Sequence, residues 1–326
     1  IYPFNFTLNK MYFTPEPKTE EKDLFGVDYA LKTLVAGLTD KDTRLIVIRG
    51  LRRTGKTSLL NVALKTSGIK FVKVDVREGP YRDRMEFFAF LAAKIKEALG
   101  ESLFRKALES VSGVGIGYKE LSATVYFSQE QNLALFLSSL DRQLKAKRNS
   151  LILAFDEVQL LKQIKFDYIL ASIFDNYLAL KVVVTGSEVG LVDSFLGKED
   201  YDAPLYGRAL TEIIIKKQNT EDTSRFLEEG FAQFGGKISF AEINEVIAQL
   251  DGIIGWSTFY GWLRYKNNSH AGALAKVRKE GKETARRELQ KFLDMRKTES
   301  KYLRLLKYLA QGYNTWGELK YNFAKD

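Results

Sequence analysis

The feature that most constrains this chain is a glycine-rich segment close to residue 50. It fits the pattern G-x-x-x-x-G-K-S/T at every fixed position, and its residues are Gly50, Leu51, Arg52, Arg53, Thr54, Gly55, Lys56, Thr57 and Ser58. Two glycines at this spacing let a loop wrap phosphate groups with its backbone N–H groups pointing inward. An apolar run at 44–49 precedes the segment and a helix-like run at 56–66 follows it. This order of strand, loop and helix predicts a nucleoside triphosphate site.

The last residues of this loop suit ATP and a magnesium ion. We expect Lys56 to reach the β and γ phosphates and the Thr57 hydroxyl to be a ligand of Mg²⁺. A helix that begins near Lys56 adds the positive end of its dipole to the same site. ATP or ADP with Mg²⁺ is therefore the expected ligand.

A second segment places two carboxylates after a buried strand. The apolar run at 151–155 ends in Asp156 and Glu157. In a sheet shared with Gly50, we expect Asp156 to hold the metal, directly or through water. Glu157 is then placed to polarise the attacking water as a general base. Many strands end in two acids, so the pattern depends on the phosphate-binding loop for its meaning.

A third polar segment follows the apolar run at 181–185. Thr185 and Ser187 flank Gly186 at its end. Side chains at the end of this strand are expected close to the water and the γ-phosphate. The alternative is an ordinary turn that ends the strand.

Short apolar runs alternate with helical patterns through the first two thirds of the chain. The expected strands are 44–49, 70–76, 150–155, 181–185 and 210–216. Such alternation is typical of βαβ units and of an α/β fold with a parallel sheet of five strands between helices. Gly113, Gly115 and Gly117 indicate a loop before a short strand at 121–126. Beyond residue 217 only helical patterns are persuasive.

Further segments, taken with the three above, resemble a known family. They are Asp23–Gly26, Asp156–Gln159, Val184–Ser187, Pro204–Arg208 and Asp251–Gly255. Their order and spacing are similar to those of the archaeal ATPase family, an AAA+-like branch of the STAND signalling ATPases. That family belongs to the additional-strand P-loop ATPases, and the resemblance covers about residues 18–326.

The resemblance implies further site residues. Phe25 and Gly26 would pack on adenine, and Gly255 would approach the nucleotide from a helical lid. Arg208 would point at the γ-phosphate, in the same subunit or in a neighbouring one. Two positions depart from the family pattern: Val27 follows Gly26 where an arginine is usual, and Ile254 takes the place of a proline.

The resemblance also implies a division into four parts. Residues 1–26 form an N-terminal extension that contributes to the adenine site, and 27–217 form the P-loop ATPase domain. Residues 218–292 form an all-α lid. Residues 293–326 look like an incomplete winged-helix domain, which in this family binds DNA or docks proteins.

The charge of the chain is concentrated near its end. From Tyr260 to Asp326 there are 16 Lys and Arg against 7 Asp and Glu, whereas the other residues carry 34 of each. This excess favours DNA as a partner of the C-terminal region, and a solvated helical face is the alternative. Protein partners and self-association stay open.

Composition excludes several other kinds of chemistry. There is no Cys and one His, His270, so thiol catalysis, Cys-based metal sites and Ser–His–Asp catalysis are not expected. No run approaches the roughly 20 apolar residues of a membrane span, so we expect a cytoplasmic protein.

The leading hypothesis is an ATP hydrolase that works as a conformational switch. ATP would close the lid on the sheet domain, and the C-terminal module would report the state. The alternatives are a DNA-binding ATPase of replication, mobile elements or transcriptional regulation, and a regulator that binds nucleotide with little turnover. A small-molecule kinase is the remaining alternative.

Overall fold

The computed structural model describes residues 12–79, 81, 83–109, 111, 114–119, 122–127, 131–186, 189–198, 200–294 and 299–325. The chain divides into two compact units, 1–262 and 263–326. The sheet, the phosphate-binding loop and the helical segment at 218–262 belong to the first unit.

The first unit is built on a parallel sheet of five strands in the order β2-β5-β6-β1-β7. The strands are β1 (Leu45–Gly50), β2 (Lys70–Asp75), β5 (Leu151–Asp156), β6 (Leu180–Gly186) and β7 (Thr211–Ile215). β6 lies between β1, which leads into the phosphate-binding loop, and β5, which ends in the acids. This is the additional strand that the resemblance implied, and the α/β fold class is confirmed.

The central strands form because their side chains are apolar on both faces. Every residue of β1, β5 and β6 is buried. Successive side chains of a strand point to opposite faces, so Leu45 and Val47 join one core while Ile46 and Ile48 join the other. Such continuous apolar runs are typical of a parallel sheet covered on both sides.

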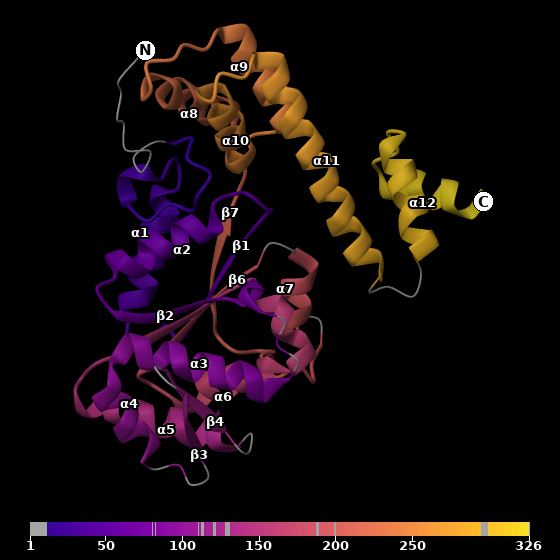
Figure 1. Ribbon diagram of the computed structural model, residues 1–326. Helices are drawn as coiled ribbons and strands as arrows, with labels where there is room; N and C mark the ends of the chain where they lie inside the picture. Colours follow the sequence, from indigo (N-terminus) through magenta and orange to yellow (C-terminus); the bar gives the residue numbers. More distant parts are fainter. Residues whose placement is uncertain are drawn as a thin grey trace. The chain divides into compact units, whose positions relative to one another are not determined.

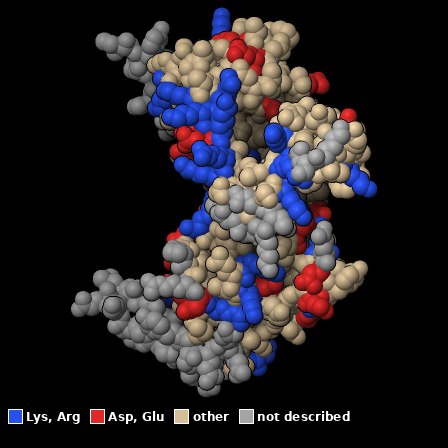
Figure 2. Space-filling model, turned by 90° about the vertical axis from the view of Figure 1, so that its right-hand side faces the viewer, with Lys and Arg blue, Asp and Glu red and all other residues tan. Residues whose placement is uncertain are grey.

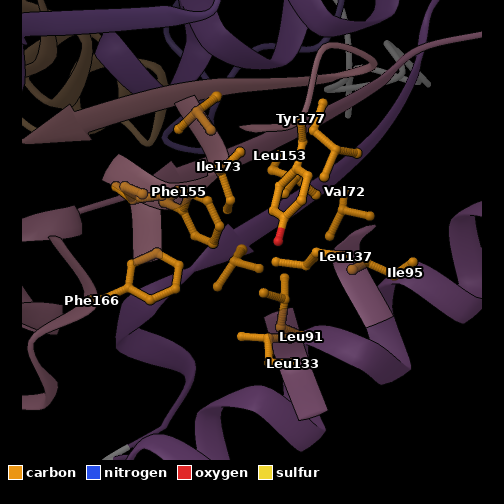
Figure 3. Close-up of a cluster of buried hydrophobic side chains, with 14 of the residues drawn as sticks. Val72, Leu91, Ile95, Leu133, Leu137, Leu153, Phe155, Phe166, Ile173 and Tyr177 are labelled. Carbon is orange, nitrogen blue, oxygen red and sulfur yellow. The ribbon is translucent and has the colours of Figure 1, made fainter. Parts of the chain in front are cut away.

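Helices cover the two faces of this sheet (Figure 1). The helices of this layer are α1 (Asp28–Thr39), α2 (Lys56–Thr66), α3 (Arg84–Leu99), α4 (Glu101–Leu108), α5 (Gln131–Ala146), α6 (Phe166–Asn176) and α7 (Val189–Leu196). α1 and α2 pack on one face, and α3, α5 and α6 on the other. Figure 3 shows the larger core, where Leu91 and Ile95 of α3 meet Leu153 and Phe155 of β5.

Short 3₁₀ helices join some of these elements. They are η2 (Glu21–Asp23), η3 (Val76–Glu78) and η4 (Val158–Ile164). η3 follows β2 and η4 follows β5, so both begin at the carboxyl edge of the sheet.

The segment between α4 and α5 differs from the expectation. Gly115 and Gly117 lie in a strand, β3 (Val114–Lys119), which pairs antiparallel with β4 (Ser122–Phe127). The predicted loop is therefore wrong at these residues, while the predicted strand near 121–126 is confirmed. Val114, Ile116 and Tyr118 alternate with the glycines, and this period of two is a strand signal that the glycines concealed.

Three helices follow the sheet: α8 (Thr220–Ala232), α9 (Phe240–Leu250) and α10 (Ile254–Tyr265). α8 begins where the Asn219 side chain accepts from the Asp222 N–H. α9 begins with a reciprocal capping box of Ser239 and Glu242. Such caps satisfy backbone donors that the first helical turn leaves unpaired.

The N-terminal segment is bound to these helices through Phe13. This side chain is buried, and a Cβ added at Gly230 of α8 or Gly261 of α10 would meet its ring at 2.3 Å. The ring therefore occupies the space that a larger residue at either glycine would need.

The second unit contains α11 (His270–Asp294), α12 (Glu299–Ala310) and α13 (Trp316–Lys325). α12 and α13 are joined where the Tyr308 hydroxyl donates to the Asn322 carbonyl at 3.0 Å. In the described part of the chain, no helix combines the length and the apolarity needed to cross a membrane. The boundaries at 26, 217 and 292 and the winged-helix assignment stay predictions.

Candidate functional site

A cavity of about 390 Å³ opens at the carboxyl ends of the strands. Its wall includes many of the expected residues: Phe25, Arg52, Arg53, Thr54, Gly55, Lys56, Thr57, Ser58, Glu157 and Gly255. Crevices at this edge of a parallel sheet are the usual ligand sites of α/β proteins. The cavity is therefore the candidate nucleotide site.

The two glycines of the loop are required by its backbone. Gly50 has φ 156°, and a Cβ there would lie 2.5 Å from the carbonyl oxygen of Ile215 on β7. Gly55 has φ 94° and directly precedes α2. Lys56 Nζ donates to the carbonyls of Gly50 at 2.9 Å and Leu51 at 2.8 Å. The ammonium group is thus held within the loop itself.

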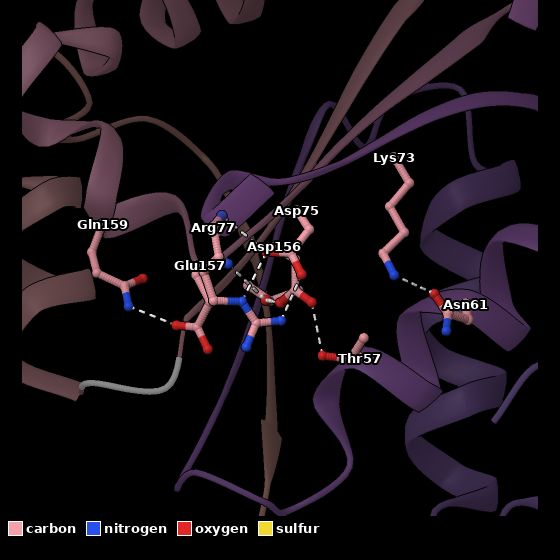
Figure 4. A network of polar contacts seen from close by, with 9 residues as sticks. Thr57, Asn61, Lys73, Asp75, Arg77, Asp156, Glu157 and Gln159 are labelled. Atoms are coloured by element: carbon pink, nitrogen blue, oxygen red, sulfur yellow. Dashed lines mark hydrogen bonds and ion pairs between the residues drawn. The ribbon is translucent and has the colours of Figure 1, made fainter. Parts of the chain in front are cut away.

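Asp156 lies outside the cavity wall and is bound to two hydroxyl groups. Thr57 Oγ1 donates to Asp156 Oδ2 at 2.7 Å, and Thr185 Oγ1 donates to Asp156 Oδ1. Figure 4 shows Thr57 and Asp156 facing each other across this bond. The loop, β5 and β6 therefore meet at one carboxylate.

Glu157 turns into the cavity through an unusual backbone conformation. Its φ is 61°, a left-handed value that non-glycine residues seldom adopt. Gln159 Nε2 donates to Glu157 Oε2 at 2.7 Å and so orients the carboxylate. A Cβ at Gly186 would lie 2.6 Å from Gln159 Oε1, so this glycine makes room for the orienting side chain.

Thr185, from the third polar segment, is fully buried, and its hydroxyl donates a hydrogen bond to Asp156. It does not line the cavity. Ser187 lies outside the described residues, so its expected position stays a prediction.

The first turn of α10 touches the phosphate-binding loop. The Gly255 N–H donates to the Arg53 carbonyl at 2.8 Å, and the Arg53 guanidinium lies 4.0 Å from the ring centroid of Trp256. A Cβ at Gly255 would approach the same carbonyl oxygen to 2.6 Å. Ile254 also lines the cavity at this point.

Phe25 stands among aromatic rings on another wall of the cavity. Its ring centroid is 5.5 Å from that of Tyr12 and 5.2 Å from that of Phe226. The Arg225 guanidinium lies 5.0 Å from the Phe25 centroid. Gly26 follows with φ 68°, which glycine adopts at little cost, but it does not line the cavity.

Arg208 lies away from the cavity of its own subunit, so the expectation of a role within the same subunit is wrong. It precedes β7, whose first residues are at the amino edge of the parallel sheet, whereas the phosphate-binding loop is at the carboxyl edge. Its Nη2 lies 2.5 Å from Asp175 Oδ2, and its Nε donates to Asp175 Oδ1 at 2.9 Å. A role toward a neighbouring subunit stays a prediction.

The sequence analysis missed two cations that line the cavity, Lys18 and Arg77. The Lys18 N–H donates to Ser58 Oγ at 3.0 Å, which fixes the N-terminal segment along α2. Burial lowers the pKa of the Lys18 ammonium to about 8. Neither residue belongs to a recognisable motif, and only the place of Arg77 just after a strand could have suggested it.

Comparison with known proteins assigns the family. Over residues 28–255 the sequence matches the family described as an ATPase domain predominantly from Archaea. The chain belongs to this archaeal ATPase family. It therefore binds nucleotide and is an ATP hydrolase.

Solved structures share the fold of this archaeal ATPase. A Walker-type ATPase of Pyrococcus abyssi has 28% identity and a TM-score of 0.71, over 96% of this chain and 87% of its own. The ORC2 protein of Aeropyrum pernix, solved as ADPNP–ADP complexes, has 14% identity and a TM-score of 0.58, over 96% and 82%. Cdc6p of Pyrobaculum aerophilum has 15% identity and a TM-score of 0.51, over 94% of this chain and 81% of its own. The last two show a likeness of fold alone. No curated protein matches the sequence.

The donors beside the loop of this archaeal ATPase fit a magnesium ion. Thr57 and Asp156 supply a hydroxyl and a carboxylate, which are hard oxygen ligands of the kind that Mg²⁺ prefers. Their contact also shows that both side chains can reach one point at the edge of the cavity. Two protein ligands are usual for Mg²⁺, since water and phosphates complete its shell.

Proposed function

We propose that this archaeal ATPase uses Mg-ATP to switch the position of its lid helices. The observation that supports the proposal is the attachment of α10 to the phosphate-binding loop through Gly255 and Trp256. The loop backbone that receives the phosphates is then the same backbone that holds α10. A ligand that contacts the loop differently as ATP and as ADP shifts the equilibrium of the helix by that difference.

Each polar residue has a definite part in this proposal. Lys56 exchanges the carbonyls of Gly50 and Leu51 for phosphate oxygens. Thr57 and Asp156 would hold a magnesium ion, which would supply positive charge to the phosphates of the nucleotide. Glu157, oriented by Gln159, accepts the proton of the attacking water.

Hydrogen exchange tests the switch. We expect residues 218–262 to exchange more slowly with a non-hydrolysable ATP analogue than with ADP, both at saturation with Mg²⁺. The core strand β5 serves as the internal control, since its protection should be the same with both nucleotides. Equal protection of 218–262 with the two nucleotides contradicts a lid that reads the γ-phosphate.

A second candidate function, DNA binding, is favoured by α11. Arg278, Lys282 and Arg286 recur every four residues, so they form one stripe with successive side chains about 6 Å apart along the axis. All three are exposed, and in the described part of the chain none takes part in an ion pair. Figure 2 shows a face of the molecule on which Lys and Arg side chains gather.

The salt dependence of binding tests this function. A variant carrying R278Q, K282Q and R286Q should bind duplex DNA more weakly, with a log–log salt slope reduced by about 2–3. The matched control carries K276Q, R287Q and K307Q, which lose the same charge away from the stripe, and it should keep a slope closer to that of the wild type. Binding that ignores salt, or equal losses in the two variants, argues against a DNA surface on α11.

A further inference from the structure

Arg77 occupies a position in the nucleotide cavity that no sequence motif assigns. It lies in η3, directly after β2, and lines the same cavity as Lys56 and Glu157. Val76 is buried beside it, so the turn is anchored in the core. β2 pairs with β5 in a register that sets Asp75 beside Asp156, which brings η3 next to the acid pair.

The guanidinium of Arg77 is held by a carboxylate of its own turn. Its Nε donates to Asp75 Oδ1 at 2.8 Å and its Nη2 to Asp75 Oδ2 at 2.6 Å. This two-pronged geometry matches the way arginine binds carboxylate or phosphate. In the described structure, Nη1 makes no hydrogen bond, and 48% of the side chain is exposed.

Three carboxylates near the end of β5 stabilise the charged form of this guanidinium. Hydrogen bonding to Asp75, and then the charges of Asp75, Asp156 and Glu157, raise the pKa of the guanidinium. Figure 4 shows Arg77 between Asp75 and the acid pair. Outside the phosphate-binding loop, Arg77 is the only arginine among the described residues that line the cavity. Arg208, the arginine expected for the γ-phosphate, binds Asp175 instead.

We propose that Arg77 binds the terminal phosphate of ATP within its own subunit, and that Asp75 competes with this phosphate for the guanidinium. The proposal rests on the nucleotide site described above. An arginine released from Asp75 offers the terminal phosphate the same two donors that now hold a carboxylate. Asp75 thereby sets how strongly the site distinguishes ATP from ADP.

Nucleotide affinity, measured by calorimetry with Mg²⁺ and either ADP or a non-hydrolysable ATP analogue, tests the proposal without turnover. R77Q should weaken binding of the analogue about tenfold and change ADP binding less than about twofold. D75N should change the affinity in the opposite direction and strengthen binding of the analogue several-fold. R77K keeps the charge but loses the fork, so it should fall between R77Q and the wild type.

A double variant separates release of Arg77 from the plain loss of a negative charge. If Asp75 acts through Arg77, D75N has no effect on analogue binding in the R77Q background. If D75N strengthens binding equally in both backgrounds, the competition is refuted. Equal losses of ADP and analogue binding in R77Q also overturn the proposal, since Arg77 is then a structural counter-ion.

Two controls keep these outcomes distinct from other failures. K56A should lose both nucleotides, and unchanged binding in K56A would falsify the nucleotide site itself rather than the part of Arg77. Thermal unfolding of every variant identifies a folding defect. If R77Q is defective, the single variants R77K and D75N still show whether analogue binding becomes weaker or stronger.

Discussion

At the residue scale, the carboxylate of Asp156 is bound by side chains from different elements. Thr57 comes from α2 and Thr185 from β6, and they donate to different oxygens of Asp156. The carboxylate is thus fixed from both sides before any metal is considered, because its rotation would break one of the two bonds. Glu157 is fixed in another way, by its backbone conformation and by Gln159.

Replacing Glu157 by Gln should abolish turnover while leaving nucleotide binding intact. The amide oxygen of the new side chain can still accept from Gln159, so the local structure is kept. The base is lost, and we expect steady-state ATP hydrolysis to fall by about 10²- to 10⁴-fold. ADP affinity should stay within about twofold of the wild type. Unchanged hydrolysis in this variant would show that the proton goes elsewhere.

Lys18 should make stability depend on pH in the alkaline range. Burial lowers its pKa to about 8, below the model-peptide value of 10.5, so between these pH values the unfolded chain holds more protons. Stability therefore rises with pH across this window. We expect the melting temperature of K18M to exceed that of the wild type near pH 7, and the gap to close as the pH approaches 10.5. A constant gap would mean that Lys18 keeps its ordinary pKa.

At the element scale, the junction of α10 and the phosphate-binding loop depends on the absence of a side chain. Gly255 lets its own N–H reach the Arg53 carbonyl, and Gly252, three residues earlier, has φ 69° and lies against the backbone of Gln218. The family pattern predicted that this turn would come near the nucleotide. It did not predict the stacking of Arg53 on Trp256, because Arg53 stands at a variable position of the loop motif and Trp256 belongs to no motif.

G255A should separate α10 from the loop. The added Cβ would lie 2.6 Å from the Arg53 carbonyl oxygen, so the helix must shift. We expect a loss of about 1–3 kcal/mol in the free energy of unfolding and weaker ADP binding. G317A in α13 is the matched control, since nothing lies within 4 Å of its Cβ, and it should be neutral or slightly stabilising. Equal effects of the two changes would exclude the close contact.

At the scale of the whole molecule, the sequence predicted the elements that have a regular residue pattern. The three central strands of the sheet follow from continuous apolar runs, and the loop from its spaced glycines. Lys18 and Arg77 could not be predicted, because they enter the cavity from segments whose path depends on tertiary packing. Strand β3 was missed because Gly115 and Gly117 are turn signals that a two-residue period overrides.

Replacing Phe13 tests how the N-terminal segment of the first unit is joined to α8 and α10 near the unit's other end. Its ring packs against glycines of α8 and α10, far away in the sequence. F13A should lower the free energy of unfolding by about 3–5 kcal/mol, as loss of a buried phenyl ring does. F240A is the control, because Phe240 is 75% exposed, and it should change stability by less than about 0.5 kcal/mol. Chemical denaturation monitored by circular dichroism measures both, and a small loss in F13A would refute the anchoring.

The stacking of Arg53 on Trp256 has an optical consequence. The chain has three tryptophans. A guanidinium lies 4.0 Å from the ring centroid of Trp256, whereas Trp316 is 79% exposed. A cation over an indole perturbs its excited state, so intrinsic fluorescence registers whether α10 touches the phosphate-binding loop. The protein thereby carries its own unlabelled reporter of the proposed lid movement, which can be read in a stopped-flow instrument during a single turnover.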